Sequence, residues 1–171
     1  MKVTVRHTYP FDPGIYWETL YGHRPFIEAL YTEGLDGEDL QILAWRDSDD
    51  GSYSRALSFM PKMNAPKAVK KVLGARFRCE ERGQYDPTRG AWRFEYISGS
   101  MASKISIHGE HATHPHTEGC EVVSTLDIQV SILGVGRLVE RTIARQFERD
   151  MCAQATFIRR WVDDRPDLKT P

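Results

Sequence analysis

Long hydrophobic runs are absent from this sequence. No apolar stretch approaches the roughly 20 residues that a helix needs to cross a bilayer, and the N-terminal residues lack the apolar core of a signal peptide. We therefore expect no transmembrane segment, so any contact with a membrane should be peripheral.

Cysteine is scarce as well. The chain has three cysteines, Cys79, Cys120 and Cys152, which are widely spaced and form no CxxC pair. An odd number of isolated cysteines does not indicate a disulfide framework. This composition predicts a reduced, cytoplasmic protein.

The short motifs that often carry catalysis are missing too. The sequence contains no GxSxG, no GxGxxG and no P-loop, which disfavours catalysis driven by such a motif. The formal net charge of −1 gives no overall field that would attract nucleic acid. We expect no cofactor and no nucleic-acid partner.

What the sequence does contain is enough for one hydrophobic core. Its 171 residues, of which 40% are hydrophobic, are the size of one domain. We expect a single domain over residues 1–165, followed by a tail over residues 166–171.

One long helix is predicted near the C-terminus, over residues 134–164. At about 100° per residue its apolar side chains fall within an arc roughly 120° wide, and charged residues lie on the opposite side. The apolar arc contains Ile143, Ala144, Phe147, Met151, Ala155, Ile158, Trp161 and Val162. No other predicted helix is long enough to cover this arc, so we expect it to pack on a sheet.

Alternation of apolar and polar residues predicts strands in most of the remaining chain. The expected strands cover residues 2–9, 40–46, 53–60, 75–85, 91–97, 101–111 and 120–132. A helical pattern begins at Asp12-Pro13 and is interrupted by Gly22 and Pro25, which predicts two short helices after the first strand. One further helical turn is expected at residues 68–73.

This order of elements resembles the START-like, helix-grip superfamily. The resemblance includes the segment 66–74, which reads PKAVKKVLG, and the Gly134-Val135-Gly136 sequence that leads into the final helix. It is nearest to bacterial members of unassigned function. The resemblance implies an α+β fold in which a curved antiparallel sheet of about six to seven strands surrounds the C-terminal helix. It also implies a cavity between sheet and helix that receives lipids, sterols, polyketides or other apolar molecules.

Candidate cavity residues follow from the strand faces and from the inner side of the helix. The residues predicted to bind the ligand are Tyr53, Arg55, Leu57, Phe59, Trp92, Phe94, Tyr96, Ser103, Ile105, Ile107, Leu126, Ile128, Glu140, Ile143, Phe147, Met151, Gln154 and Ile158. Rows of this kind are equally typical of an ordinary packed core. An inward Arg55 needs a partner, for which Glu140, Asp127 or a polar ligand head are candidates.

Two functions of different classes fit this interpretation. The favoured one is non-catalytic binding, transport or sensing of a hydrophobic ligand, a lipid or sterol. The alternative is a cyclase or aromatase in which Tyr96, Arg55, Glu140 and His7 are the candidate acid and base groups. Buried ionisable groups that hydrogen-bond one another at the cavity floor would favour the enzyme. A weaker third option is a protein-interaction module that uses the outer face of the sheet.

Histidines cluster in one part of the sequence. His108, His111, His114 and His116 lie near Glu110, which is a ligand set that zinc or iron accepts. Their spacing suits a metal poorly, since His108 and His111 should point to opposite faces of a strand. We expect residues 113–119 to form a solvated hairpin tip and expect no metal site.

A basic segment over residues 62–78 is the candidate for membrane contact. It contains Lys62, Lys67, Lys70, Lys71, Arg76 and Arg78, mixed with apolar residues. Near a cavity mouth such a segment would suit contact with anionic lipid. Its other interpretation is a loop with solvated lysines that closes the end of the fold. Aromatic residues are not interleaved with these cations, which argues against nucleic acid.

Overall fold

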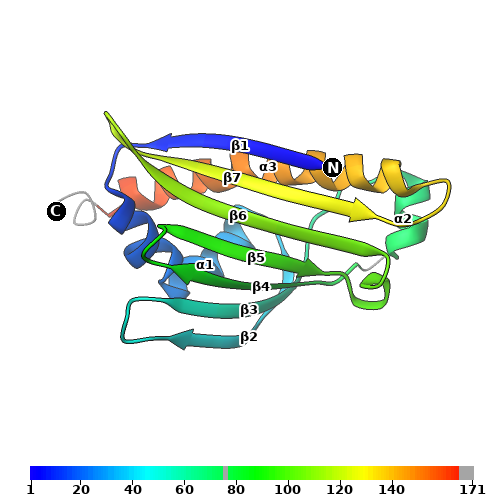
Figure 1. Cartoon of the computed structure of the whole chain (residues 1–171), viewed down its shortest axis with the longest axis horizontal. Helices are drawn as coiled ribbons and strands as arrows, with labels where there is room; N and C mark the ends of the chain where they lie inside the picture. Colours follow the sequence, from blue (N-terminus) through cyan, green and yellow to red (C-terminus); the bar gives the residue numbers. More distant parts are fainter. Residues whose placement is uncertain (75–76, 166–171) are drawn as a thin grey trace.

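The computed structural model describes residues 1–74 and 77–165, apart from the side chain of Ser100. The predicted strand residues 75 and 76, Arg76 of the basic segment and the predicted tail at 166–171 therefore lie outside the described residues. One antiparallel sheet of seven strands forms the body of the molecule, in the order β1-β7-β6-β5-β4-β3-β2 (Figure 1). The strands are β1 (Lys2–Tyr9), β2 (Glu38–Asp47), β3 (Tyr53–Met60), β4 (Cys79–Asp86), β5 (Ala91–Ile97), β6 (Ile105–His116) and β7 (Gly119–Val130).

The long helix α3 (Gly136–Asp163) lies along one face of this sheet, next to β7 and β1 (Figure 1). Its predicted apolar arc is buried, with Ile158 fully inaccessible and Trp161 partly exposed. The arginines of the opposite side are exposed, as expected for an amphipathic helix that covers a sheet. The helix-grip α+β fold predicted from the sequence is confirmed.

Short helical segments close the two ends of the space between α3 and the sheet (Figure 1). At one end η1 (Ile15–Tyr21), α1 (Arg24–Ala29) and η2 (Leu30–Gly34) follow β1, with the break at Gly22. At the other end α2 (Lys67–Leu73) lies beside the N-terminal half of α3. A single turn, η3 (Gly99–Met101), connects β5 to β6.

Two glycines let large aromatic side chains lie flat on the inner face of the sheet. A Cβ atom at Gly83 would lie 2.1 Å from the Trp92 ring, and one at Gly109 would lie 2.2 Å from the Phe94 ring. Both glycines sit opposite Phe94 in the strand register. Any other residue at these positions would push the aromatic rings into the interior.

Several predicted strand bounds differ from the structure, and those of one strand misplace a candidate residue. Sequence alternation placed that strand at residues 101–111, whereas β6 begins at Ile105 and continues to His116. Ser103 consequently lies in the preceding turn, exposed to solvent, and does not line the interior. The turn forms because Met101 and Lys104 make local backbone hydrogen bonds, to the carbonyls of Ser98 and Met101. In the described residues, no helix is both long and apolar enough to cross a membrane.

Candidate functional site: an interior cavity with a polar floor

Aromatic rings fill the interior at the end closed by η1. We call this region the aromatic half. The Trp17 ring stacks on Tyr85 at 4.7 Å between centroids, and Tyr85 in turn stacks on Tyr53 at 4.9 Å. Tyr21 packs on Trp92, which is fully buried. Ring-to-ring contacts therefore dominate the packing between η1 and the sheet.

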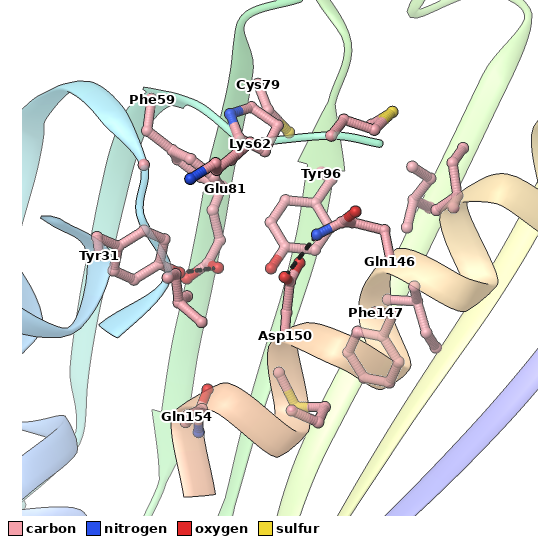
Figure 2. Close-up of a pocket in the computed structure, with 18 of the residues that line it drawn as sticks. Tyr31, Phe59, Lys62, Cys79, Glu81, Tyr96, Gln146, Phe147, Asp150 and Gln154 are labelled. Atoms are coloured by element: carbon pink, nitrogen blue, oxygen red, sulfur yellow. Dashed lines mark hydrogen bonds between the residues drawn. The ribbon is translucent and has the colours of Figure 1, made fainter. Parts of the chain in front are cut away.

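The other end of the interior is hollow. A cavity of about 90 Å³ lies between α3 and the sheet, in the region that we call the cavity half (Figure 2). It is lined by Tyr21, Tyr31, Leu35, Gly37, Phe59, Pro61, Lys62, Met63, Phe77, Cys79, Glu81, Tyr96, Ile107, His111, Leu126, Ile143, Gln146, Phe147, Asp150, Met151 and Gln154. A cavity needs only about 10–15 Å³ to hold one water molecule. The cavity therefore exceeds an ordinary packing defect.

Residues 61–63 and Phe77 lie where the cavity meets a second hollow, and we call them the mouth of the cavity. These same residues also line a groove of about 640 Å³ on the outside, which runs along α2. Lys67, Lys70 and Lys71 contribute to this groove and are exposed. The way out of the cavity thus passes a positively charged surface.

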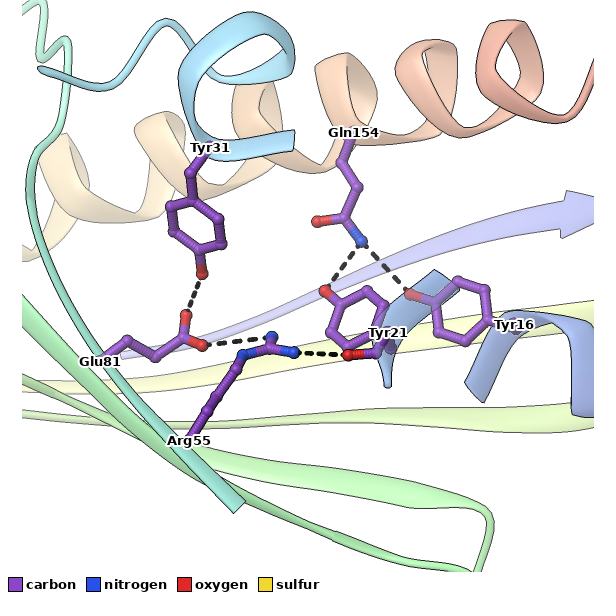
Figure 3. Close-up of polar contacts among 6 residues, drawn as sticks. All are labelled: Tyr16, Tyr21, Tyr31, Arg55, Glu81 and Gln154. Atoms are coloured by element: carbon purple, nitrogen blue, oxygen red, sulfur yellow. Dashed lines mark hydrogen bonds and ion pairs between the residues drawn. The ribbon is translucent and has the colours of Figure 1, made fainter. Parts of the chain in front are cut away.

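A buried ion pair separates the two halves (Figure 3). Nη2 of Arg55 lies 3.5 Å from Oε1 of Glu81, and both side chains are almost fully buried. The other guanidinium nitrogen, Nη1, donates a 2.8 Å hydrogen bond to the Tyr21 carbonyl, and the Tyr31 hydroxyl donates to Oε2 of Glu81. The guanidinium also lies over the Trp92 ring, 4.2 Å from its centroid. Arg55, Glu81 and Tyr31 therefore form one buried ionisable network, in which an ion pair and a hydrogen bond meet at Glu81.

This network corrects the predicted partners of Arg55. Glu140 accepts a 3.1 Å hydrogen bond from the backbone N–H of Val130, and Asp127 is exposed near the N-terminal amine. Burial alone would lower the pKa of Arg55, but the Glu81 carboxylate reverses the effect and the pKa is raised. Arg55 is therefore a permanent cation whose charge Glu81 balances.

Asp150 brings a second carboxylate to the cavity, from α3. Its Oδ1 accepts a 2.7 Å hydrogen bond from Nε2 of Gln146, and the Gln146 carbonyl oxygen accepts one of 2.6 Å from Arg149. Burial raises the pKa of Asp150 to about 6, although Gln146 and Arg149 act in the opposite direction. The Tyr96 hydroxyl also points into the cavity (Figure 2), and burial raises its pKa well above the usual value.

Two further polar side chains lie near Tyr31, Glu81 and Asp150, and we call these five residues the floor of the cavity. Nε2 of Gln154 donates to the hydroxyls of Tyr16 and Tyr21, at 3.2 and 3.0 Å (Figure 3). Nδ1 of His111 is hydrogen-bonded to the Ser124 hydroxyl at 2.8 Å. Burial, followed by the charge of Arg55, lowers the pKa of His111 to about 3, so this ring is neutral.

The placement of His111 partly corrects the expected histidine-rich turn. β6 continues through His116, the chain turns at Thr117 and Glu118, and His111 is only 4% exposed. His114 and His116 are exposed near the tip, as predicted. Throughout residues 1–74 and 77–165, no group of three His, Cys, Asp or Glu side chains is arranged to hold a metal ion.

The predicted ligand-binding residues divide into those that line the cavity and those that do not. Those that line the cavity are Phe59, Tyr96, Ile107, Leu126, Ile143, Phe147, Met151 and Gln154. Those that are buried outside the lining are Tyr53, Arg55, Leu57, Trp92, Phe94, Ile105, Ile128 and Ile158. Glu140 is half-buried outside it, and Ser103 is exposed. The strands β3 and β5 extend through both halves. Residues on one face of such a strand can therefore lie in either half.

Several lining residues were not predicted, among them Glu81, Asp150, Gln146 and Tyr31. A signal for Glu81 exists, because it shares a strand face with Cys79 and Tyr85, which are buried. Gln146 and Asp150 precede Gln154, a predicted residue inside the apolar arc of α3, at intervals of four residues. A polar stripe of that spacing follows one side of a helix and would have identified them.

One family model matches nearly the whole chain. It is described as "Protein of unknown function (DUF2505)" and covers residues 4–162. No curated protein matches the sequence.

Solved structures share the fold at low sequence identity. The protein TTHA0849 from Thermus thermophilus has a TM-score of 0.65 and 18% identity over 92% of this chain and 97% of its own. The Zhui aromatase/cyclase from Streptomyces sp. R1128 has a TM-score of 0.63 and 14% identity, over 95% and 96% of the two chains. Norcoclaurine synthase from Thalictrum flavum has a TM-score of 0.60 and 16% identity, over 92% and 87%. These similarities show the START-like, helix-grip fold.

Proposed function

The chain belongs to the family described as "Protein of unknown function (DUF2505)", and we propose that it binds a small, mainly apolar molecule in the cavity between α3 and the sheet. The cavity itself is the observation that carries this proposal. Protein interiors are packed to nearly crystalline density and contain few voids larger than a water molecule. A hollow of about 90 Å³ beside the aromatic half therefore supports a role in ligand binding.

The size of the cavity limits what it accepts. Pockets for drug-sized ligands measure about 300–1,000 Å³, whereas this cavity measures about 90 Å³. A single ring or a short chain fits that volume. A longer acyl chain would have to leave through the mouth and continue along the outer groove beside α2. A whole sterol requires residues 61–63 to move away from the cavity.

The basic surface at the mouth supports a finer proposal, namely release or uptake of the ligand at an anionic membrane. Lys67, Lys70 and Lys71 project from α2, directly beside the mouth. Each such cation contributes about 1 kcal/mol near an anionic bilayer. Sedimentation with phosphatidylglycerol vesicles should recover more protein than sedimentation with phosphatidylcholine vesicles, and salt should abolish the difference. Equal recovery would contradict membrane contact and leave ligand binding untouched.

Direct identification of a bound molecule tests the main proposal. The protein is purified and extracted, the extract is analysed by mass spectrometry, and displacement of fluorescent apolar probes is measured. The variant Met151→Trp fills the cavity from α3 and should lose binding. Thr156→Trp places the same ring on an exposed position of α3 and serves as its control. Failure to find or load any apolar molecule would contradict the proposal.

A second candidate function is acid–base catalysis, as in a cyclase or aromatase. The network of Tyr31, Glu81 and Arg55 favours it, because Tyr31 and Glu81 are hydrogen-bonded ionisable groups of the lining and Arg55 is ion-paired to Glu81 behind them. Asp150, with a raised pKa of about 6, could exchange a proton near neutral pH. Incubation of an identified ligand with catalytic amounts of protein separates the two functions. A changed mass supports the enzyme, and an unchanged mass supports binding alone.

A further inference from the structure

Negative charge predominates in the described lining of the cavity. Its two carboxylates belong to Glu81 and Asp150, and its one cationic side chain belongs to Lys62. Lys62 lies at the mouth, has 73% of its side chain exposed and is paired with Asp36. The depth of the cavity therefore contains carboxylates but no lining cation.

The two carboxylates differ in how well their charge is balanced. Glu81 has Arg55 at 3.5 Å, although its Oε1 atom receives no hydrogen bond and is buried. Among the described residues, Asp150 has no cation in direct contact, since Arg149 reaches it only through Gln146. A carboxylate taken out of water without a cation is costly. Asp150 is consequently the point at which a cationic group would gain most.

The hydrogen bonds around the floor leave acceptors available and use the donors of Gln146, Gln154 and Tyr31. Gln146 donates to Asp150, Gln154 donates to two tyrosine hydroxyls, and the Tyr31 hydroxyl donates to Glu81. Oδ2 of Asp150 and the carbonyl oxygen of Gln154 have no hydrogen bond in the described part of the chain. A guest that completes these groups must bring hydrogen-bond donors.

Aromatic rings surround the same space. Phe59, Phe77, Tyr96 and Phe147 line it, together with the Tyr31 ring (Figure 2). Aromatic faces attract cations, and this attraction strengthens where water is excluded. Aromatic walls with a carboxylate at the base are a suitable environment for an ammonium group, and a poor one for an anion.

We propose that the ligand is an amine, in which a protonated primary or secondary amino group binds Asp150 and an apolar ring or short chain occupies the rest of the cavity. This assignment rests on the proposed function and gives it a ligand class. The volume of about 90 Å³ limits the apolar part to the size of one ring. The ammonium donates to Asp150, and its remaining protons are directed at the open acceptors of the floor.

The test compares head groups on one apolar body. Benzylamine, benzyl alcohol and benzoate are titrated into the full chain at pH 7.5 by calorimetry, and hexylamine, hexanol and hexanoate repeat the series with a chain. We expect each amine to bind at least about tenfold more tightly than its alcohol, and each carboxylate to bind most weakly. An alcohol or a carboxylate that binds as well as the amine would overturn the amine assignment and leave cavity binding intact. The absence of binding by every compound would contradict the proposed function itself.

Matched variants test whether the preference for amines depends on the carboxylate of Asp150. Asp150→Asn keeps the shape and should lose about tenfold in affinity for benzylamine while its affinity for benzyl alcohol is unchanged. Glu148→Gln removes the same charge from an exposed position of α3 and should behave as the natural protein does. An amine preference that survives in Asp150→Asn would contradict the role of Asp150.

The pH dependence of amine binding gives an independent readout. The ionisable groups around Asp150 are Tyr21, Tyr31, Lys62, Cys79, Glu81, Tyr96 and His111 of the lining and Arg149 of its own helix. The tyrosines and His111 titrate far from pH 6, because burial displaces their pKa values away from it. Protonation of Asp150, whose pKa is about 6, should weaken benzylamine binding roughly tenfold between pH 7 and pH 5. A flat profile, or the same slope in Asp150→Asn, would contradict this assignment.

Discussion

The two halves of the interior are built on the same strands and the same helix, yet one is filled and the other is hollow. In the aromatic half, η1 inserts Tyr16, Trp17 and Tyr21 between α3 and the sheet. In the cavity half, α2 buries only Val69 fully. The difference shows that the short end segments decide where this fold keeps room for a guest, while α3 and the sheet provide the frame.

The halves also differ in their polar groups. Arg55 lies on the aromatic side of the boundary and has a carboxylate, a carbonyl and three rings around it. Asp150 belongs to the cavity half and has one amide donor. Several contacts stabilise the first group, although its Nε atom has no hydrogen bond, whereas the single donor on the second leaves room for a ligand to add more.

Removal of Glu81 should have the largest effect, because it breaks the boundary between the halves. Glu81→Ala leaves the Arg55 guanidinium buried without a counter-charge, and such a loss costs about 3–5 kcal/mol. The double variant Arg55→Met with Glu81→Leu removes both charges and should cost less than Glu81→Ala. Urea unfolding measures both free energies. A double variant that is less stable than the single one would show that the pair itself is strongly stabilising.

A matched pair of phenylalanines on α3 tests the contrast in packing. Phe157 is 4% exposed and packs against Phe26, with centroids 5.9 Å apart, whereas Phe147 is 5% exposed and lines the cavity. Phe157→Ala should cost about 3–5 kcal/mol of unfolding free energy, as a fully packed ring does. Phe147→Ala should cost clearly less, about 1–2 kcal/mol, because one side of its ring already lacks protein contacts. Equal losses would indicate that the cavity half is packed as densely as the other.

Substitution of Asp150 should have a smaller effect than these variants, and it should stabilise the protein instead of destabilising it. Because the pKa of Asp150 is raised from 3.8 to about 6 on folding, ionisation above pH 6 destabilises the fold. Asp150→Asn should therefore raise the unfolding free energy at pH 7 by about 1–3 kcal/mol. The gain in unfolding free energy should shrink as the pH falls from 6 towards 4, because Asp150 of the folded natural protein is protonated there. Glu148→Gln is the control, and a destabilised Asp150→Asn would mean that the carboxylate has a structural role.

The frame of the molecule was predictable, and the division of its interior was not. Apolar periodicity identified α3 and the faces of the strands, since those patterns report which side is buried. Tyr53 and Phe59 share one row of β3, and Trp92 and Tyr96 share one row of β5. In each pair the first packs in the aromatic half and the second lines the cavity, because η1 covers only one end of the strand.

The floor of the cavity depended on contacts between distant parts of the chain. Glu81 and Tyr31 are 50 residues apart, and Gln154 reaches a tyrosine 138 residues away. The spacing of residues along one helix or strand does not indicate contacts between residues so far apart in the sequence. The Gln146, Asp150 and Gln154 stripe was the exception, because it follows a single helix.

The methionine methyl groups provide the most direct test of the hollow interior. Met63 and Met151 line the cavity, whereas Met1 and Met101 lie away from it. In a protein labelled with ¹³C at the methionine methyls, benzylamine is titrated and the methyl resonances are followed by NMR. The account predicts saturable shifts of Met151 and Met63, with Met1 and Met101 unchanged, and loss of the response at the Met63 methyl in Met151→Trp. Saturating ligand that leaves the Met151 methyl unmoved would contradict a guest between α3 and the sheet.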